Sequence, residues 1–342
     1  MELFHDNEGA VVRVKAAYES RNPAEVPQVI VGTGFFISRE GHILTNASGV
    51  ENSNRIWIVY KGVDYAARLI GADRSTNLAL LKVLTMPDDF PFIQLGDNPA
   101  LPTPGTFLLR IASPLDLSPS PSMGMVSGVE SRFGEHIFPC GLIRTTIPAG
   151  PGESGGAYLD LNGRLVGIQV GSLSEIGSTY ILPARAVMRV RDDLLFYGKV
   201  TDGWVGFDVA LDTSVADGTR VVIRNVIAGT PAKEAGMQAG DQLVQVGIYP
   251  VRDLDDLRNA LFYTRVGEYV PVKLRRKGDI VEYTVRIAQR PPNADDLAGQ
   301  PQPQEDEPAV IGPRSDDAQP QDEPAPEQTP PVQPPAPADA DR

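Results

Sequence analysis

Cysteine and histidine are scarce in this chain of 342 residues. The single cysteine, Cys140, excludes an internal disulfide and a metal site built from cysteines, and we interpret it as a buried or loop thiol. Three histidines, His5, His42 and His136, supply the only side chains that ordinarily titrate near neutral pH. The sequence indicates no metal site, and we predict no cofactor.

Long apolar runs and clusters of positive charge are also missing. No stretch approaches 18 consecutive apolar residues, so we predict no transmembrane segment. The net charge is −13 and no basic patch stands out, which argues against nucleic-acid binding. The first residues, MELFHDNEGAVVRV, lack a basic segment followed by an apolar one, so no signal peptide is visible. If the sequence as written is complete, a cytoplasmic location follows.

Most of the negative charge lies at the C-terminal end. From Pro291 onward there are 12 acidic residues and 2 arginines, which gives −10 of the total of −13, together with 14 of the 31 prolines. Such a segment cannot bury enough apolar surface to fold. We predict a disordered tail over residues 291–342 that acts as a solubilising spacer, with docking to a partner as the alternative.

The most informative segment that is present reads GPGESGGA, from Gly150 to Ala157. A serine needs a base in hydrogen-bond reach and donors for the developing oxyanion before it can transfer acyl groups. Glycines around Ser154 allow a tight turn whose backbone N–H groups converge on one point. We therefore predict an oxyanion loop formed by Gly152, Glu153 and Ser154, with Ser154 at the nucleophile position.

Strand patterns surround this loop. The run VGTGFFISREGHILTN, from Val31, predicts a hairpin that turns at residues 39–41, and residues 55–83 predict three further strands. After the serine, AYLDLNGRLVGIQV predicts a hairpin with a two-residue turn at Asn162 and Gly163. Residues 184–197 read as a helix with one apolar face that ends at Gly198. The strand spacing is typical of an all-β barrel.

Taken in order, residues 9–195 resemble the HtrA (Do-like) family of trypsin-fold serine proteases. The resemblance implies an all-β, trypsin-like double β-barrel over residues 1–198. It also implies a catalytic triad, whose family patterns are TNxHVV, DxALL and GNSGG. In this chain the first pattern reads TNASGV, with Ser48 at the histidine position, and the second reads STNLALLKV, with Asn77 at the aspartate position.

These two substitutions remove the chemistry of the triad. Ser48 cannot accept a proton near neutral pH, and the amide of Asn77 cannot stabilise an imidazolium by charge. Loss of a triad member typically costs about 10⁴-fold or more in turnover, and losses within the triad are not additive. Ser154 is therefore interpreted as the remnant of a nucleophile.

Another histidine would have to replace the missing base. His42 lies six residues before Ser48 on a predicted strand, up to about 20 Å away, so it should not reach that position. His136, in RFGEHIFPCG, is expected in a loop on the serine side of the barrel and stays open as a substitute base.

The segment from Gly203 to Arg290 resembles a PDZ domain of the HtrA type, and we place the domain at residues 199–290. Its most diagnostic part is AGTPAKEAGMQAGDQLVQV, in which Pro231 fits the first turn of a short helix that ends at Gly236. We expect a β-sandwich-like fold with two helices. Such domains add a peptide as a strand to the sheet edge and capture its terminal carboxylate with loop amides. The predicted peptide-binding residues are Trp204, Val205, Gly206, Phe207, Leu257, Ala260 and Leu261, of which Leu261 is equally consistent with core packing.

Two functions follow from this reading. The first is a pseudoprotease, in which the barrel is a scaffold and the PDZ domain binds protein or peptide C-termini, partners active HtrA-type relatives or holds misfolded chains. The alternative is a serine endopeptidase that uses Ser154 with a non-standard base; a purely structural role is a third, weaker option. The resemblance implies a location in the cell envelope or periplasm. The oligomeric state is open: relatives form trimers through N-terminal contacts, and Phe4 is the one large aromatic residue near this start.

Overall fold

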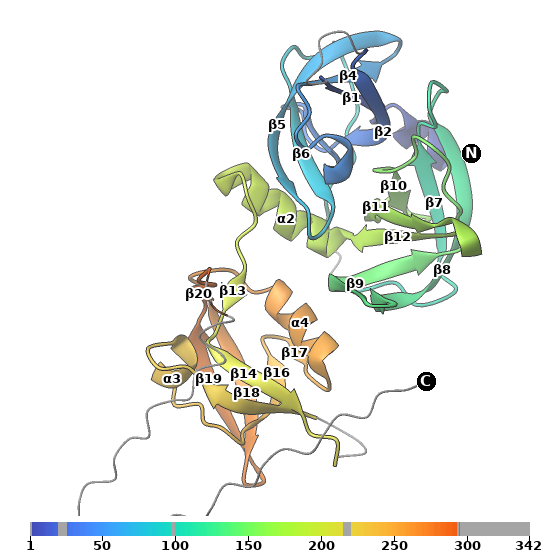
Figure 1. Cartoon of the computed structure of the whole chain (residues 1–342). Coiled ribbons are helices and arrows are strands. Elements are labelled where there is room, and N and C mark those ends of the chain that lie inside the picture. The colour runs from blue at the N-terminus through green and yellow to red at the C-terminus, as the bar shows by residue number, and fades with distance from the viewer. Residues whose placement is uncertain (1, 20–25, 97–99, 215–219, 293, 295–342) are drawn as a thin grey trace, which may run out of the picture. The chain divides into compact units, whose positions relative to one another are not determined.

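The computed structural model describes residues 2–19, 26–96, 100–214, 220–292 and 294 (Figure 1). The fold is mostly β: two closed barrels are followed by a smaller β domain, in the order that the sequence predicts for a trypsin-like double barrel and a PDZ domain. The predicted acidic tail over residues 291–342 lies almost entirely outside the described residues, so it stays a prediction. The domain boundaries at 198 and 290 stay predictions as well.

The first barrel is a closed sheet in the order β1-β2-β3-β6-β5-β4. Its apolar side chains alternate inward along the strands and form a core around Phe36, Ile58 and Leu81, all fully buried. The predicted hairpin and the three strands after it are confirmed. The strands are β1 (Val11–Tyr18), β2 (Gln28–Phe36), β3 (His42–Asn46), β4 (Arg55–Tyr60), β5 (Val63–Asp73) and β6 (Leu78–Val83).

The second barrel closes in the order β10-β11-β12-β9-β8-β7. The serine loop joins β9 to β10, so the barrel holds both ends of that loop. The strands are β7 (Phe107–Ala112), β8 (Ser120–Phe133), β9 (His136–Thr145), β10 (Ala157–Leu159), β11 (Leu165–Leu173) and β12 (Ser178–Pro183), with two 3₁₀ turns, η1 (Ala47–Gly49) in the first barrel and η2 (Ser174–Ile176) in the second.

The turn prediction at Asn162 and Gly163 is wrong in detail. The hairpin forms, but its strands end at Leu159 and resume at Leu165, and only Gly163 of the pair has a positive φ, 79°. Asp160 explains the longer loop, because its carboxylate accepts hydrogen bonds from the amides of Asn162 and Arg164, both at 2.9 Å. An acceptor of this kind stabilises a wider Asx-type turn in place of a two-residue type I′ turn.

Two helices pack on the barrels. The helix α1 (Glu2–Glu8) places Leu3 and Phe4 against the main core. The predicted helix at residues 184–197 is confirmed as α2 (Ala184–Tyr197), and Gly198 ends it in the left-handed conformation, φ 71°, with its amide bonded to the carbonyl of Leu194 at 3.0 Å. No helix in the described ranges has the length and apolar character needed to cross a membrane.

The PDZ domain is built on a sheet in the order β14-β15-β16-β18-β19, with β17 paired to β16 and β13 paired to β20. The strand β14 lies at the edge of this sheet. Pro231 begins the short helix α3 as predicted, and the second helix, α4, is capped by the carboxylate of Asp253. The elements are β13 (Gly203–Trp204), β14 (Phe207–Leu211), β15 (Val221–Val226), α3 (Pro231–Glu234), β16 (Gln242–Val246), β17 (Tyr249–Pro250), α4 (Leu254–Phe262), β18 (Tyr269–Arg276), β19 (Asp279–Arg286) and β20 (Ala288–Gln289).

Candidate functional site

The serine loop begins with a tight turn over residues 150–153. Pro151 and Gly152 occupy its central positions, Gly152 has φ 82°, and the amide of Glu153 faces the carbonyl of Gly150 at 3.4 Å. Proline followed by a positive-φ glycine is the signature of a type II turn. A side chain on Gly152 would collide with the backbone of Leu115, so only glycine fits here.

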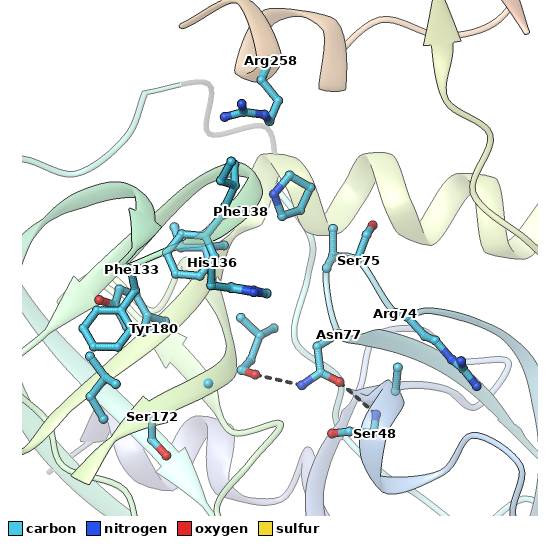
Figure 2. A pocket seen from close by; sticks show the side chains of 18 of the residues that line it. Ser48, Arg74, Ser75, Asn77, Phe133, His136, Phe138, Ser172, Tyr180 and Arg258 are labelled. Atoms are coloured by element: carbon cyan, nitrogen blue, oxygen red, sulfur yellow. Dashed lines mark hydrogen bonds between the residues drawn. The ribbon is translucent and has the colours of Figure 1, made fainter. Parts of the chain in front are cut away.

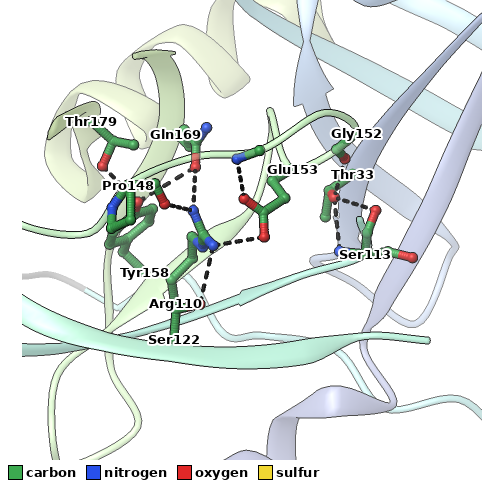
Figure 3. Close-up of polar contacts among 11 residues, drawn as sticks. Thr33, Arg110, Ser113, Ser122, Pro148, Gly152, Glu153, Tyr158, Gln169 and Thr179 are labelled. Carbon is green, nitrogen blue, oxygen red and sulfur yellow. Dashed lines mark hydrogen bonds and ion pairs between the residues drawn. The ribbon is translucent and has the colours of Figure 1, made fainter. Parts of the chain in front are cut away.

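The backbone donors that an oxyanion needs are free. Neither the amide of Gly152 nor that of Ser154 donates a hydrogen bond within the described part of the chain. The carbonyls of the same residues accept hydrogen bonds. Thr33 donates from Oγ1 to the oxygen of Gly152 at 2.8 Å (Figure 3). The amide of Thr33 donates to the oxygen of Ser154, also at 2.8 Å. The two amides that could stabilise an oxyanion are therefore unpaired, and they belong to the segment that carries the exposed Ser154.

A buried ion pair connects the serine loop to the second barrel. The guanidinium of Arg110, 3% exposed, contacts the carboxylate of Glu153, 11% exposed, at 2.7 Å (Figure 3). The same guanidinium donates to the carbonyl of Pro148 at 2.7 Å, and the other oxygen of Glu153 accepts from the amide of Gly150. Glu153 therefore connects the first residue of the turn, Gly150, to Arg110 on β7.

Arg110 is a site residue that our reading of the sequence missed. Its signal is an arginine inside the otherwise apolar strand FLLRIA. A charge in such a run is costly to bury unless it is paired, so it points to an interior partner. Polar groups of the second barrel complete its surroundings, because Arg110 also contacts Ser122 at 3.1 Å and Gln169 at 3.4 Å (Figure 3).

Ser48 and Asn77 occupy adjacent places at the end of the first barrel (Figure 2). Ser48 lies in η1 and is exposed. The side-chain oxygen of Asn77 accepts from the amide of Ser48 at 2.9 Å, and its NH₂ group donates to the carbonyl of Val170 at 2.8 Å. Asn77 adopts a left-handed conformation, φ 54°, which asparagine tolerates better than most residues.

Asn77 therefore links the two barrels. One end of its amide fixes η1, while the other reaches β11, 93 residues away in the sequence. Its backbone oxygen also accepts from the amide of Ala47 at 3.1 Å. An aspartate could accept the hydrogen bond from the amide of Ser48, but an ionised aspartate has no N–H that could donate to the carbonyl of Val170. Only an asparagine can make both hydrogen bonds at this position.

The structure brings Ser48 and Ser154 to one pocket of about 230 Å³. A separate cleft of about 900 Å³ is lined by Ser48, Asn77 and His136 on an apolar background that includes Phe133 and Tyr180 (Figure 2). Ser154 does not line this second cleft. His136 thus shares this cleft with Ser48 and Asn77, and among the described residues no hydrogen bond joins it to Ser154.

The predicted loop position of His136 needs correction. This residue is the first of β9, in the β8–β9 hairpin, and its ring packs edge-on against Phe138 at 5.4 Å between centroids.

His42 is half-buried, and its Nδ1 hydrogen-bonds to the hydroxyl of Ser38 at 2.9 Å. Burial, followed by the charge of Lys82, lowers the pKa of His42. Cys140 is buried, which raises the pKa of its thiol to about 12 and leaves it protonated.

The predicted carboxylate-binding loop of the PDZ domain connects β13 to β14. Its carbonyls point into the domain: the oxygen of Val205 accepts from Ala232 and that of Gly206 from Ile227, both at 2.9 Å. Gly206 has φ 91°, and a side chain there would collide with Thr230. The chain is therefore fixed in a conformation that requires glycine.

The predicted groove residues differ in burial. Trp204 and Phe207 are half-buried, while Val205 lies in the PDZ core. On α4, Leu257 and Ala260 are buried in the same core, and Leu261 packs against it while partly exposed. Peptide contact by these residues stays a prediction.

Family comparisons agree with the two-domain architecture. Residues 32–168 match the model of the trypsin-like peptidase domain, and residues 188–287 match that of the PDZ domain. The chain is therefore a trypsin-like barrel protein with an appended PDZ domain. Its fold is similar to that of a solved HtrA-type protease.

Two proteins named as serine endoproteases are similar to most of the chain. A protein of Chlamydia trachomatis serovar D named "Probable periplasmic serine endoprotease DegP-like" is 30% identical over 76% of this chain and 54% of its own length. A protein of Hahella chejuensis with the same name is 30% identical over 83% of this chain and 62% of its own. The chain thus spans little more than half of these relatives.

Solved structures show the same fold. The HtrA-type protease AlgW with tripeptide superposes with a TM-score of 0.67 at 24% identity, covering 85% of this chain and 97% of that one. The serine endoprotease from Yersinia pestis superposes with a TM-score of 0.58, also at 24% identity, covering 84% and 97%.

Proposed function

We propose that this protein binds exposed peptide C-termini through its PDZ domain and that its barrel is a pseudoprotease scaffold. The observation that carries the second part is the pairing of Ser48 with Asn77 where a histidine and a carboxylate are needed. Neither residue can remove the proton from Ser154 at neutral pH. The donor role of Asn77 toward Val170 further supports a structural use of this position.

Peptide binding is supported by the position of β14 at the edge of the described sheet and by the hydrogen-bonded loop before it. A peptide that adds to this edge would place its terminal carboxylate at the amides of residues 204–207. One structural relative, AlgW, carries a tripeptide. Because the matched relatives are named periplasmic, we place the protein in the cell envelope, where unfolded chains and active HtrA-type relatives are the partners that fit.

Amidation of the peptide C-terminus is expected to weaken binding about 10- to 100-fold, since hydrogen bonds to a charged group contribute about 1.5–3 kcal/mol. Fluorescence anisotropy with a C-terminal peptide library and its amidated copies measures this. Gly206→Ala should abolish binding, whereas Gly240→Ala, at a positive-φ glycine with open space around it, serves as the control for backbone strain. Equal affinity for free and amidated peptides would contradict carboxylate capture.

An active serine endopeptidase is the second candidate, and the preformed loop favours it. The amides of Gly152 and Ser154 are free, and Ser154 is exposed. For the pseudoprotease we expect neither fluorophosphonate labelling nor casein hydrolysis above the level of Ser154→Ala, because an unassisted serine hydroxyl is a weak nucleophile. Labelling or hydrolysis that disappears in Ser154→Ala would establish the peptidase instead.

A further inference from the structure

The outer face of the first barrel carries a half-buried tryptophan. The strands β1, β4 and β5 are neighbours in this barrel (Figure 1). Trp57 of β4 lies between Ile56 and Ile58, which pack against the barrel core, so the indole points outward. Lys15 of β1 and Ala66 of β5 lie directly opposite Trp57 on its two sides. Trp57 and the exposed Ala66 both line a depression of about 770 Å³.

Two arginines line the same depression. Ile56 of β4 is paired with Ala67 of β5, so the next outward-facing residues, Arg55 and Arg68, are neighbours across the two strands. Both are exposed, and neither forms an ion pair with a described residue. Lys82 of β6 is paired with Arg68 on its other side. Like charges at adjacent positions repel each other, and a phosphate between the two guanidinium groups would remove this repulsion and accept charge-assisted hydrogen bonds.

Fewer carboxylates than cations face this side of the barrel. Arg13 and Lys15 of β1 share the carboxylate of Asp116, at 3.4 Å from each. Asp64 of β5 is the carboxylate that lines the depression, and Glu40 lies beside the lysine of β6. The excess of positive charge is a local property of this face, because exposed charges more than about 8 Å apart are largely screened at physiological salt.

Exposed apolar side chains border the same face. Leu84, directly after β6, is 59% exposed, and its amide donates to the carbonyl of Ala66, which places it in the row of the tryptophan. Val29 of β2 is 46% exposed and is paired with Ala17, which in turn is paired with Arg55. A soluble polyanion would leave these apolar side chains in water. A lipid surface offers phosphates to the cations and an acyl-chain boundary to the aromatic and aliphatic side chains.

We propose that this face of the first barrel docks on the surface of a bilayer that contains anionic phospholipids. The guanidinium groups of Arg55 and Arg68 hold the phosphate of one headgroup in the depression. Trp57 lies at the level of the headgroups, because its indole has an apolar body and a polar N–H. Leu84 and Val29 contact the boundary of the acyl chains. The proposal goes beyond the proposed function and uses neither the PDZ domain nor the serine loop.

Sedimentation of the full chain with vesicles tests the docking. We expect binding to phosphatidylcholine vesicles with about 30% phosphatidylglycerol and about tenfold weaker binding, or less, to phosphatidylcholine alone, since each cation near an anionic surface contributes about fivefold. Equal binding to both kinds of vesicle, or binding to neither, would overturn the proposal.

Paired variants locate the surface. Arg55→Ala with Arg68→Ala should weaken vesicle binding about 25-fold, because it removes two cations from the contact. Both side chains are exposed, so the fold should be unaffected. Arg164→Ala with Arg275→Ala removes the same charge from exposed positions outside the first barrel and should retain most of the binding. Equal losses in the two double variants would reduce the effect to net charge and contradict the assignment.

Fluorescence reports the insertion of Trp57 directly. The chain has two tryptophans, and the other, Trp204, lies in the PDZ domain. Vesicles with brominated acyl chains should quench the natural chain and leave Trp57→Phe unquenched, at lipid concentrations that bind both proteins. Binding without quenching would assign the face to a soluble polyanion and overturn lipid docking. Gly206→Ala, which should abolish peptide binding, should leave vesicle binding unchanged, so that the two proposals fail separately.

Discussion

Ser48→His combined with Asn77→Asp is expected to hydrolyse casein about 10⁴-fold faster than Ser48→His alone, because an asparagine holds the new imidazole in the wrong tautomer. The expectation rests on the serine loop, whose turn at Gly152 and free amides are already formed. Initial rates at 25 °C measure the effect, and adding Ser154→Ala to the double variant supplies the background.

The same double variant should be less stable than the natural chain. Asn77→Asp removes the donor to the carbonyl of Val170, which should lower the free energy of unfolding by about 1–3 kcal/mol. Asn77→Asp alone, followed by urea denaturation, isolates this cost. A double variant that stays folded but is no more active than Ser48→His would show that the loop is not shaped for catalysis.

Glu153→Ala is expected to lower the free energy of unfolding by about 3–5 kcal/mol, since it leaves the guanidinium of Arg110 buried without its countercharge. This loss of free energy of unfolding should be larger than the loss caused by truncating an apolar core side chain of similar size. The reason is that the carboxylate of Glu153 also accepts a hydrogen bond from the amide of Gly150. Urea denaturation followed by circular dichroism measures it.

A matched pair controls for charge removal. Glu130 contacts Arg144 at 2.9 Å between β8 and β9, but these side chains are 34% and 31% exposed. Glu130→Ala should therefore cost about 1 kcal/mol or less. Replacing both partners, Arg110→Leu with Glu153→Ala, should regain part of the loss, because no buried charge is then left unpaired. Equal losses for Glu130→Ala and Glu153→Ala would contradict the buried-pair argument.

Local features of the fold were predictable from the sequence. The helix α2 ends at Gly198 as predicted, since an apolar face followed by glycine specifies both the helix and its left-handed stop. Pro231 begins α3 for a comparable reason. Turn types were harder to predict: two-residue turns with positive φ at both positions form at Lys61–Gly62 and Lys277–Gly278, not at Asn162–Gly163.

Contacts between distant strands could not be read from neighbouring residues. Arg110 and Glu153 are 43 positions apart, and their pairing depends on how β7 and the serine loop meet in the second barrel. The depression that Arg55, Trp57 and Arg68 share is likewise visible only once the register of β4 and β5 is known. No spacing rule covers such pairs, because the separation along the chain does not determine which side chains share an interior.

The β-strands, the helix at residues 184–197 and the glycine-rich serine loop could be predicted from the residues themselves, since turns and strand periodicity are local properties. The two substituted triad positions and the PDZ domain were located through the resemblance to the HtrA family. The tertiary structure alone decided that Asn77 is a donor between the barrels, that His136 faces a cleft without Ser154, and that Ser48 and Ser154 share a pocket. These are consequences of barrel closure, which brings residues from remote strands within hydrogen-bond reach.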